Sequence, residues 1–272
     1  MKISELFEAM SSRREPTTRD WFIENQNRFS QAIANYRYGR IIYRGVLGNN
    51  DDIYEVNPQT ASRRSRNTAN IYTLFVDNDP SWADYPKRSQ SLICTSDYQF
   101  ALGYGHPYVV LFENNSEIGL CPSNDWWDSF QSMSIELNRY REGRKSVYDM
   151  SSLNQTIANS FEELAGREID DTSWTGLSQD FAEMDRIIQS HTWEELAARQ
   201  GYIRAGCIVK YLKSTEQTME QGLRTLLNPT RNGFEVKSLR EQPYSANYPR
   251  EIWGSARAVM IREPVLRPLI NA

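Results

Sequence analysis

The chain has 272 residues, 39 % of them apolar and 24 % charged, which suits one large domain or a core with a substantial insertion. This composition is too apolar for a globally disordered chain. The net charge of −4 gives no overall basic field to hold nucleic acid or an anionic membrane. Three widely spaced cysteines without a CxxC pair argue against a zinc site or a disulfide framework, and no apolar run reaches membrane-spanning length. We therefore expect a cytoplasmic protein, acting in its host cell or delivered into another cell.

The first part of the chain predicts a mixture of helices and strands. Residues 3–12 favour a short helix, and residues 21–38 favour a longer one. Residues 40–46 read as a strand that ends in a Gly-Asn turn, and residues 71–76 read as a second strand.

A compact unit follows between residues 88 and 119. A short apolar strand ends at Thr95, Ser96 and Asp97, whose small polar side chains can cap a helix. The helix that they would start carries its apolar residues at the spacing of one face, and residues 108–112 form the clearest strand of the sequence. The unit places Thr95 and Ser96 at a strand end, where ligands are often bound.

The second part of the chain is mainly helical before β character returns. Helical patterns run through residues 126–229, and strand patterns reappear in residues 233–239, 251–253 and 256–261. This order indicates an α+β fold with a mixed or antiparallel β core and a large helical insertion. The predicted parts are residues 1–125 (N-terminal helices and the first part of the core), 126–229 (the insertion) and 230–272 (the strands that complete the core).

Several familiar catalytic motifs are absent from the sequence. It contains no GxxxxGK[ST] phosphate loop, no GxGxxG after a strand, no HExxH and no GxSxG. The chain has only two histidines, His106 and His191, so histidine catalysis and multi-histidine metal sites are disfavoured. The remaining chemistry belongs to arginines, hydroxyls and carboxylates.

Three short motifs occur in the order found in ADP-ribosyltransferases. Arg44 lies in IIYRGV, the triplet Cys94-Thr95-Ser96 ends a later strand, and Glu251 opens a late strand in YPREIW. This resembles the arginine, Ser-Thr-Ser and glutamate arrangement of that family, in which an alanine on a short helix and then a strand follow the triplet. Ala101 and residues 108–112 match that continuation. The triplet here begins with cysteine, and the long gap before Glu251 requires the helical insertion.

The resemblance implies a core of ADP-ribosyltransferase type, with NAD as substrate and a macromolecular acceptor, protein rather than nucleic acid. Pro249 stands where the family often carries a second acidic residue or glutamine, which argues against arginine as the modified side chain. Glu251 would face solvent and stabilise positive charge on the ribose, so we expect Glu251→Gln to abolish turnover without lowering stability. Arg44 would hold the pyrophosphate or ribose through its fork of donors.

The same resemblance gives roles to further side chains. Thr95 and Ser96 would orient Glu251 or the nicotinamide, and Tyr98 or Tyr104 would stack on the nicotinamide ring. A basic set upstream of the triplet would contact the phosphates of NAD or a nucleic-acid acceptor. That set comprises Arg63, Arg64, Arg66 and Arg88. An effector of toxin or phage type would fit this chemistry.

Two other functions stay open at this stage. The chain has 7 Trp and 15 Tyr, so a non-catalytic binding or assembly protein, for example of viral origin, would dock a partner through an aromatic surface around Trp126 and Trp127. A glycosidase would use Asp125 and Asp128 as its paired carboxylates. The site residues also have ordinary structural readings: Arg44 as a surface ion pair, Thr95 with Ser96 as a helix cap, and Glu251 as a solvated residue at the start of a strand. The paired aspartates would then complement a helix dipole.

Overall fold

A computed structural model describes residues 17–48, 51–60, 63–64, 69–140, 147, 149–197, 206–241 and 248–271. The helix predicted over residues 3–12, and Arg66, lie outside these ranges.

Eight strands of the described chain form one sheet, in the order β2-β8-β4-β1-β3-β7-β5-β6. Every pair of neighbouring strands is antiparallel. The strands are β1 (Tyr43–Val46), β2 (Ile53–Val56), β3 (Leu92–Thr95), β4 (His106–Phe112), β5 (Glu117–Leu120), β6 (Glu235–Ser238), β7 (Glu251–Gly254) and β8 (Ala258–Arg262). The prediction of a mixed fold with an antiparallel core is therefore confirmed, and the strands around the three motifs lie where the sequence places them.

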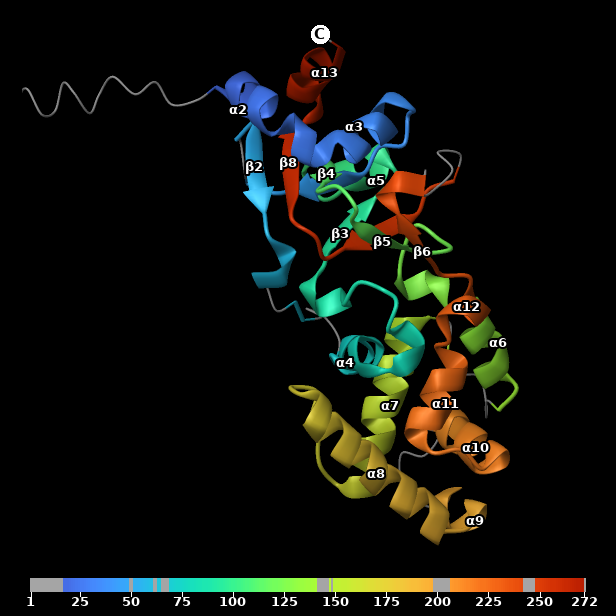
Figure 1. Cartoon of the computed structure of the whole chain (residues 1–272). Helices are drawn as coiled ribbons and strands as arrows, with labels where there is room; N and C mark the ends of the chain where they lie inside the picture. Colours follow the sequence, from blue (N-terminus) through green and yellow to red (C-terminus); the bar gives the residue numbers. More distant parts are fainter. Residues whose placement is uncertain are drawn as a thin grey trace, which may run out of the picture.

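Helices α2, α3 and α13 lie at the end of the sheet that is uppermost in Figure 1. Their bounds are Thr18–Asn25, Ser30–Arg37 and Glu263–Asn271. Buried residues from all three join those of the sheet in one apolar core, which includes Ile33, Val109 and Ile270.

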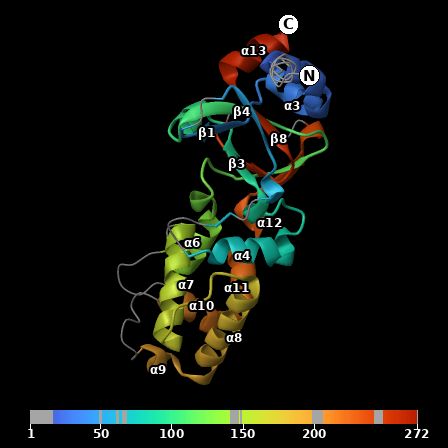
Figure 2. The ribbon, with the colours of Figure 1, turned by 90° about the vertical axis from the view of Figure 1, so that its left-hand side faces the viewer.

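A second group of helices lies at the opposite end of the molecule (Figures 1 and 2). Its members are α4 (Ile71–Asn78), α6 (Gln131–Asn138), α7 (Met150–Ala165), α8 (Trp174–Ser190), α9 (Trp193–Ala197), α10 (Gly206–Thr215), α11 (Met219–Leu226) and α12 (Pro229–Asn232). All of them except α12 contribute residues to a separate apolar core, to which Trp253 of β7 also belongs. Strand β7 therefore contributes side chains to both cores.

The segment predicted as a strand over residues 71–76 is helix α4, so that prediction is wrong. Five of its residues are buried, from Ile71 to Val76, and the helix packs against α7 and α8. A short run that is apolar on nearly every side has no useful periodicity, and its β-branched and aromatic residues favoured the strand. The partner helices decide the outcome, and they come from a distant part of the sequence. The boundaries predicted at residues 125 and 229 stay predictions.

The single helix predicted over residues 21–38 is divided into α2 and α3 by one turn of 3₁₀ helix, Gln26–Phe29. The turn between β4 and β5 contacts this break. The Asn114 side chain donates to the carbonyl of Asn27 at 2.7 Å, and its backbone N–H donates to the carbonyl of Arg28 at 2.8 Å. These carbonyls bond outside the helix, which accounts for the change in its geometry.

The unit between residues 88 and 119 forms as predicted. Asp97 caps helix α5 (Tyr98–Leu102) by accepting from the backbone N–H groups of Gln99 and Phe100 at 2.8 and 3.2 Å. Helix α5 lies directly on β1, because a Cβ atom at Gly45 would lie 2.0 Å from the carbonyl oxygen of Ala101. The glycine therefore allows the end of β3, helix α5 and β1 to meet in one place.

Candidate functional site around Glu251

The three motifs lie on three consecutive strands of the sheet, β1, β3 and β7. Tyr43 pairs with Thr95, and Thr95 pairs with Glu251, so these residues form one row across the strands. Arg44 follows Tyr43 directly. The sequence left open whether Arg44 and Glu251 lie near each other, and the strand order brings their segments together.

Arg44 occupies the place where β1 and β3 separate. The two strands pair only at Tyr43 and Thr95 within the described residues, and the Nη1 atom of Arg44 donates to the carbonyl of Ile93 on β3. Burial raises the pKa of the neighbouring Cys94 thiol to about 12, while the charge of Arg44 lowers it and that of Glu251 raises it further. The charges of Arg44 and Glu251 therefore act on the same buried thiol.

Glu251 is buried, with 8 % of its surface exposed, and both carboxylate oxygens have donors. The Nη2 atom of Arg88 lies 2.5 Å from Oε1, and the backbone N–H of Trp126 donates to Oε2 at 3.1 Å. The backbone of Glu251 is also held, because its N–H donates to Ser123 and its carbonyl accepts from Cys121. The expectation of a solvent-facing carboxylate is wrong: a long-range contact, 163 residues away in the sequence, covers it.

Arg88, expected to bind phosphate, is the buried partner of Glu251, with 4 % of its surface exposed. The Asp77 carboxylate accepts from its backbone N–H at 2.5 Å, and its guanidinium lies 3.9 Å from the ring centre of Trp126 and 5.5 Å from that of Trp253. Burial acts to lower the pKa of Arg88, but the charge of Glu251, with smaller contributions from other neighbours, outweighs it and leaves that pKa raised. The guanidinium therefore stays charged and fixes one end of the carboxylate.

The hydroxyls of Thr95 and Ser96 tie the end of β3 to neighbouring loops. Thr95 Oγ1 donates to the Asn124 side chain at 3.0 Å and accepts from the Asp97 N–H at 3.0 Å. Ser96 Oγ accepts from the backbone N–H of Arg250 at 2.9 Å, and the Ser96 N–H donates to the Arg250 carbonyl. Ser96 thereby positions the residue immediately before Glu251. The described hydrogen bonds to the Glu251 carboxylate come from other residues.

Tyr98 and Tyr104 both present exposed rings beside this row. Tyr98 meets Tyr43 edge to face, with the ring centres 5.4 Å apart. Burial raises the pKa of Tyr104, and the charges of Asp125 and Glu251 raise it further, so the Tyr104 hydroxyl lies within the field of the site.

Two further charged residues belong to the site. Burial raises the pKa of Asp125. A hydrogen bond from the Trp127 N–H lowers this pKa, while the negative charges of Glu251 and Asp128 raise it. The side chain of Arg63 is exposed at the surface. Desolvation of its guanidinium by nearby protein atoms lowers its pKa, and the positive charge of Arg88 lowers it further. Glu251 and Arg44 also act on Arg63, in opposite directions. The sequence placed Asp125 in a rival site and Arg63 in a general basic cluster, because neither position carries a local signal that points to Glu251.

The structure also bears on the other candidate residues. Trp126 has 1 % of its surface exposed, so it packs the interior instead of forming a docking surface. Arg64 donates to the carbonyl of Thr172 at 3.0 Å, away from Glu251. Within the described ranges, no cluster of three or more His, Cys, Asp or Glu side chains could hold a metal ion. In the same ranges, no helix has the length and apolar character needed to cross a membrane.

Comparison with known proteins gives no relative from which a function could be inferred. No protein-family model, no curated protein and no solved structure matches this chain.

Proposed function

We propose that the protein is an NAD-dependent ADP-ribosyltransferase that modifies a macromolecular acceptor. One observation carries the proposal: Arg44, Thr95 and Glu251 lie on adjacent antiparallel strands, with Thr95 and Glu251 in direct register and Ser96 directly after the end of β3. The sequence order suggested the resemblance, and the strand order supplies a place where the three motifs meet.

The proposed reaction breaks the bond between the ribose C1′ and nicotinamide, whose nitrogen takes the bonding electrons. Positive charge develops on the ribose, as in glycoside cleavage, and a fixed carboxylate stabilises it. Glu251 suits this role because Arg88 and the Trp126 N–H hold its two oxygens in one orientation. Each oxygen retains lone pairs that can accept from a ribose hydroxyl. The acceptor nucleophile then forms a bond to C1′ and loses its proton.

The cations near Glu251 support binding of a pyrophosphate. Arg44 uses one guanidinium nitrogen on the Ile93 carbonyl, and the fork geometry of arginine leaves further donors for phosphate oxygens. Arg63 is exposed, and the charges of Arg44, Arg88 and Glu251 act on its pKa, so it adds a second cation in the neighbourhood of Glu251. The exposed rings of Tyr98 and Tyr104 are the groups that we assign to stacking on nicotinamide.

The test is release of nicotinamide from NAD, measured with and without cell lysate as a source of acceptor. We expect Glu251→Gln to lower the rate about 100-fold or more, because it removes the charge that the transition state needs. Arg44→Ala should lower the rate at low NAD concentration through weaker binding. Labelled NAD would then show whether protein or nucleic acid receives the ADP-ribose.

Two variants serve as matched controls. Arg64→Ala removes an arginine next to Arg63 that bonds to a different part of the chain, and Glu235→Gln removes a glutamate whose partner is Arg250. Both should retain nicotinamide release. If the wild type releases no nicotinamide and NAD at millimolar concentration does not raise its melting temperature, the proposal is wrong and a non-catalytic binding protein is favoured.

A further inference from the structure

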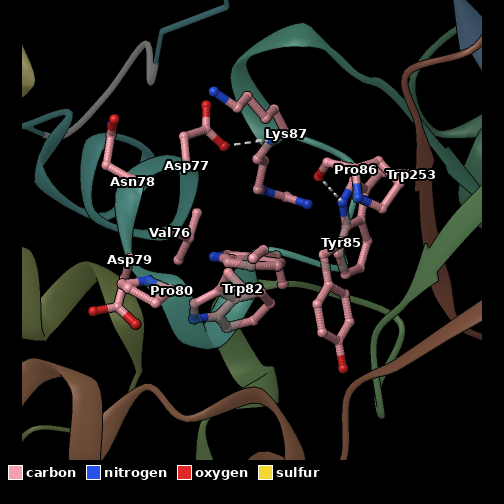
Figure 3. Close-up of a pocket in the computed structure, with 13 residues that line it drawn as sticks. Val76, Asp77, Asn78, Asp79, Pro80, Trp82, Tyr85, Pro86, Lys87 and Trp253 are labelled. Atoms are coloured by element: carbon pink, nitrogen blue, oxygen red, sulfur yellow. Dashed lines mark hydrogen bonds between the residues drawn. The ribbon is translucent and has the colours of Figure 1, made fainter.

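Arg88 also lines a cavity of 240 Å³. Figure 3 shows the side chains around this cavity. Its lining comes from the end of α4, from the following segment down to η4 (Arg88–Gln90), and from Trp126 and Trp253. Glu251 is not among its lining residues. The cavity is therefore distinct from the site proposed for NAD, although Arg88 and Trp126 contact both.

Four aromatic side chains line the cavity, Trp82, Tyr85, Trp126 and Trp253, and hydrogen bonds hold three of them in place. Trp253 Nε1 donates to the Pro86 carbonyl at 2.9 Å, as the dashed line in Figure 3 shows. Trp82 Nε1 donates to the Leu227 carbonyl at 3.1 Å, and the Tyr85 hydroxyl donates to the Phe234 carbonyl at 3.0 Å. The polar ends of these rings are satisfied, so a ligand would meet fixed ring surfaces.

The carboxylates of the lining already have donors. Asp77 accepts from the backbone N–H groups of Arg88 and Ser89, at 2.5 and 3.0 Å. Asp79 accepts from Ser81 through one oxygen and pairs with Arg224 Nε at 2.8 Å through the other. Arg224 therefore offsets the charge of Asp79, whereas Asp77 keeps its charge with its oxygens directed at the backbone N–H groups that begin η4.

The cationic and N–H donors of the lining are not fully used. Arg88 Nε, Arg88 Nη1 and Trp126 Nε1 are buried without a hydrogen-bond partner in the described structure, although the Trp126 ring lies against the guanidinium. Lys87 also lines the cavity and is exposed to solvent. An acceptor group with negative charge would satisfy donors that the protein leaves unpaired.

We propose that this cavity binds a small planar aromatic acid, with the ring against the aromatic wall and the carboxylate facing Lys87 and Arg88. The volume suits one ring. The inference is independent of the NAD reaction, because it depends on the cavity and its unpaired donors alone.

Titration of the full chain with benzoate or nicotinate, followed by tryptophan fluorescence, tests this proposal because Trp82, Trp126 and Trp253 line the cavity. We expect saturable binding with a Kd of about 0.1–10 mM, as suits ligands of this size. Cyclohexanecarboxylate, which carries the same charge on a non-planar ring, should bind at least fivefold more weakly.

Two variants at the exposed rim locate the binding without disturbing Arg88. Ala83→Phe should fill the cavity and abolish the fluorescence change, and Lys87→Met should weaken binding at least fivefold. Lys237→Met, which removes the same charge from strand β6, should bind like the wild type. Absence of saturation up to about 50 mM benzoate, well above the expected Kd, would overturn the proposal. An unchanged response in Ala83→Phe would also overturn it.

Discussion

Replacing Glu251 with glutamine should destabilise the protein as well as remove its proposed catalytic charge. Glu251 and Arg88 have exposed fractions of 8 % and 4 %, so the change leaves a buried guanidinium without its counter-charge. Glutamine keeps one carbonyl oxygen, which can accept a hydrogen bond from Arg88 or from the Trp126 N–H. The ionic attraction between the Arg88 guanidinium and the carboxylate is lost.

The size of the effect follows from the geometry of the pair. At the observed 2.5 Å, an effective dielectric constant of about 20 gives a gross attraction of roughly 7 kcal/mol. Desolvation of the two ions offsets much of this, and loss of one partner of a buried pair costs about 3–5 kcal/mol. Because glutamine retains an acceptor, we expect Glu251→Gln to lower the free energy of unfolding by about 2–4 kcal/mol.

Urea unfolding followed by tryptophan fluorescence measures this change, since Trp126 and Trp253 lie against Arg88. With an m-value of about 3 kcal/mol/M, the midpoint should fall by roughly 1 M. The control is Glu235→Gln, whose 2.6 Å pair with Arg250 is partly exposed and should cost less than about 1 kcal/mol. The reasoning fails if Glu251→Gln unfolds within about 0.5 kcal/mol of the wild type, below the cost of losing a buried partner.

Three smaller perturbations test other parts of the structure by the same unfolding assay. Asp97→Ala removes the cap of α5 and should cost about 1 kcal/mol, whereas no change would mean that the cap does not form. Gly45→Ala places a methyl group 2.0 Å from the Ala101 carbonyl oxygen and should cost about 1–3 kcal/mol, whereas a stabilised variant would contradict this packing. Burial raises the pKa of Asp185 from 3.8 to about 6, although the Met219 N–H donates to it. The folded state then binds more protons than the unfolded state between about pH 4 and 6, so stability should fall as the pH rises through that window, by about 1–2 kcal/mol for this partly exposed group. Asp185→Asn should remove this dependence, and an identical pH profile in the variant would refute the assignment.

The strands of the candidate site could be predicted because their signals are local. Thr95 to Asp97 combine a strand end with a helix cap, and Asp97 is the residue that caps α5. The adjacency of β1, β3 and β7 is a property of non-local pairing, which no segment of the sequence records.

Burial of Glu251 could not be predicted for the same reason. Its partner Arg88 is 163 residues away in the sequence, and the Trp126 N–H that completes the contact is 125 residues away. A glutamate after Pro249 and Arg250 reads as a solvated strand start when only its neighbours are considered. Helix α4 shows the same limit, since the helices α7 and α8 that bury its apolar run follow much later in the chain.

The most direct test of the central proposal is nicotinamide release from NAD by the wild type and by Glu251→Gln, each at a temperature where circular dichroism shows it folded. The proposal predicts measurable release by the wild type. It predicts a rate lower by a factor of about 100 or more in the variant, because the fixed carboxylate stabilises the transition state. Equal rates in the two folded proteins, or no release by either, would contradict it.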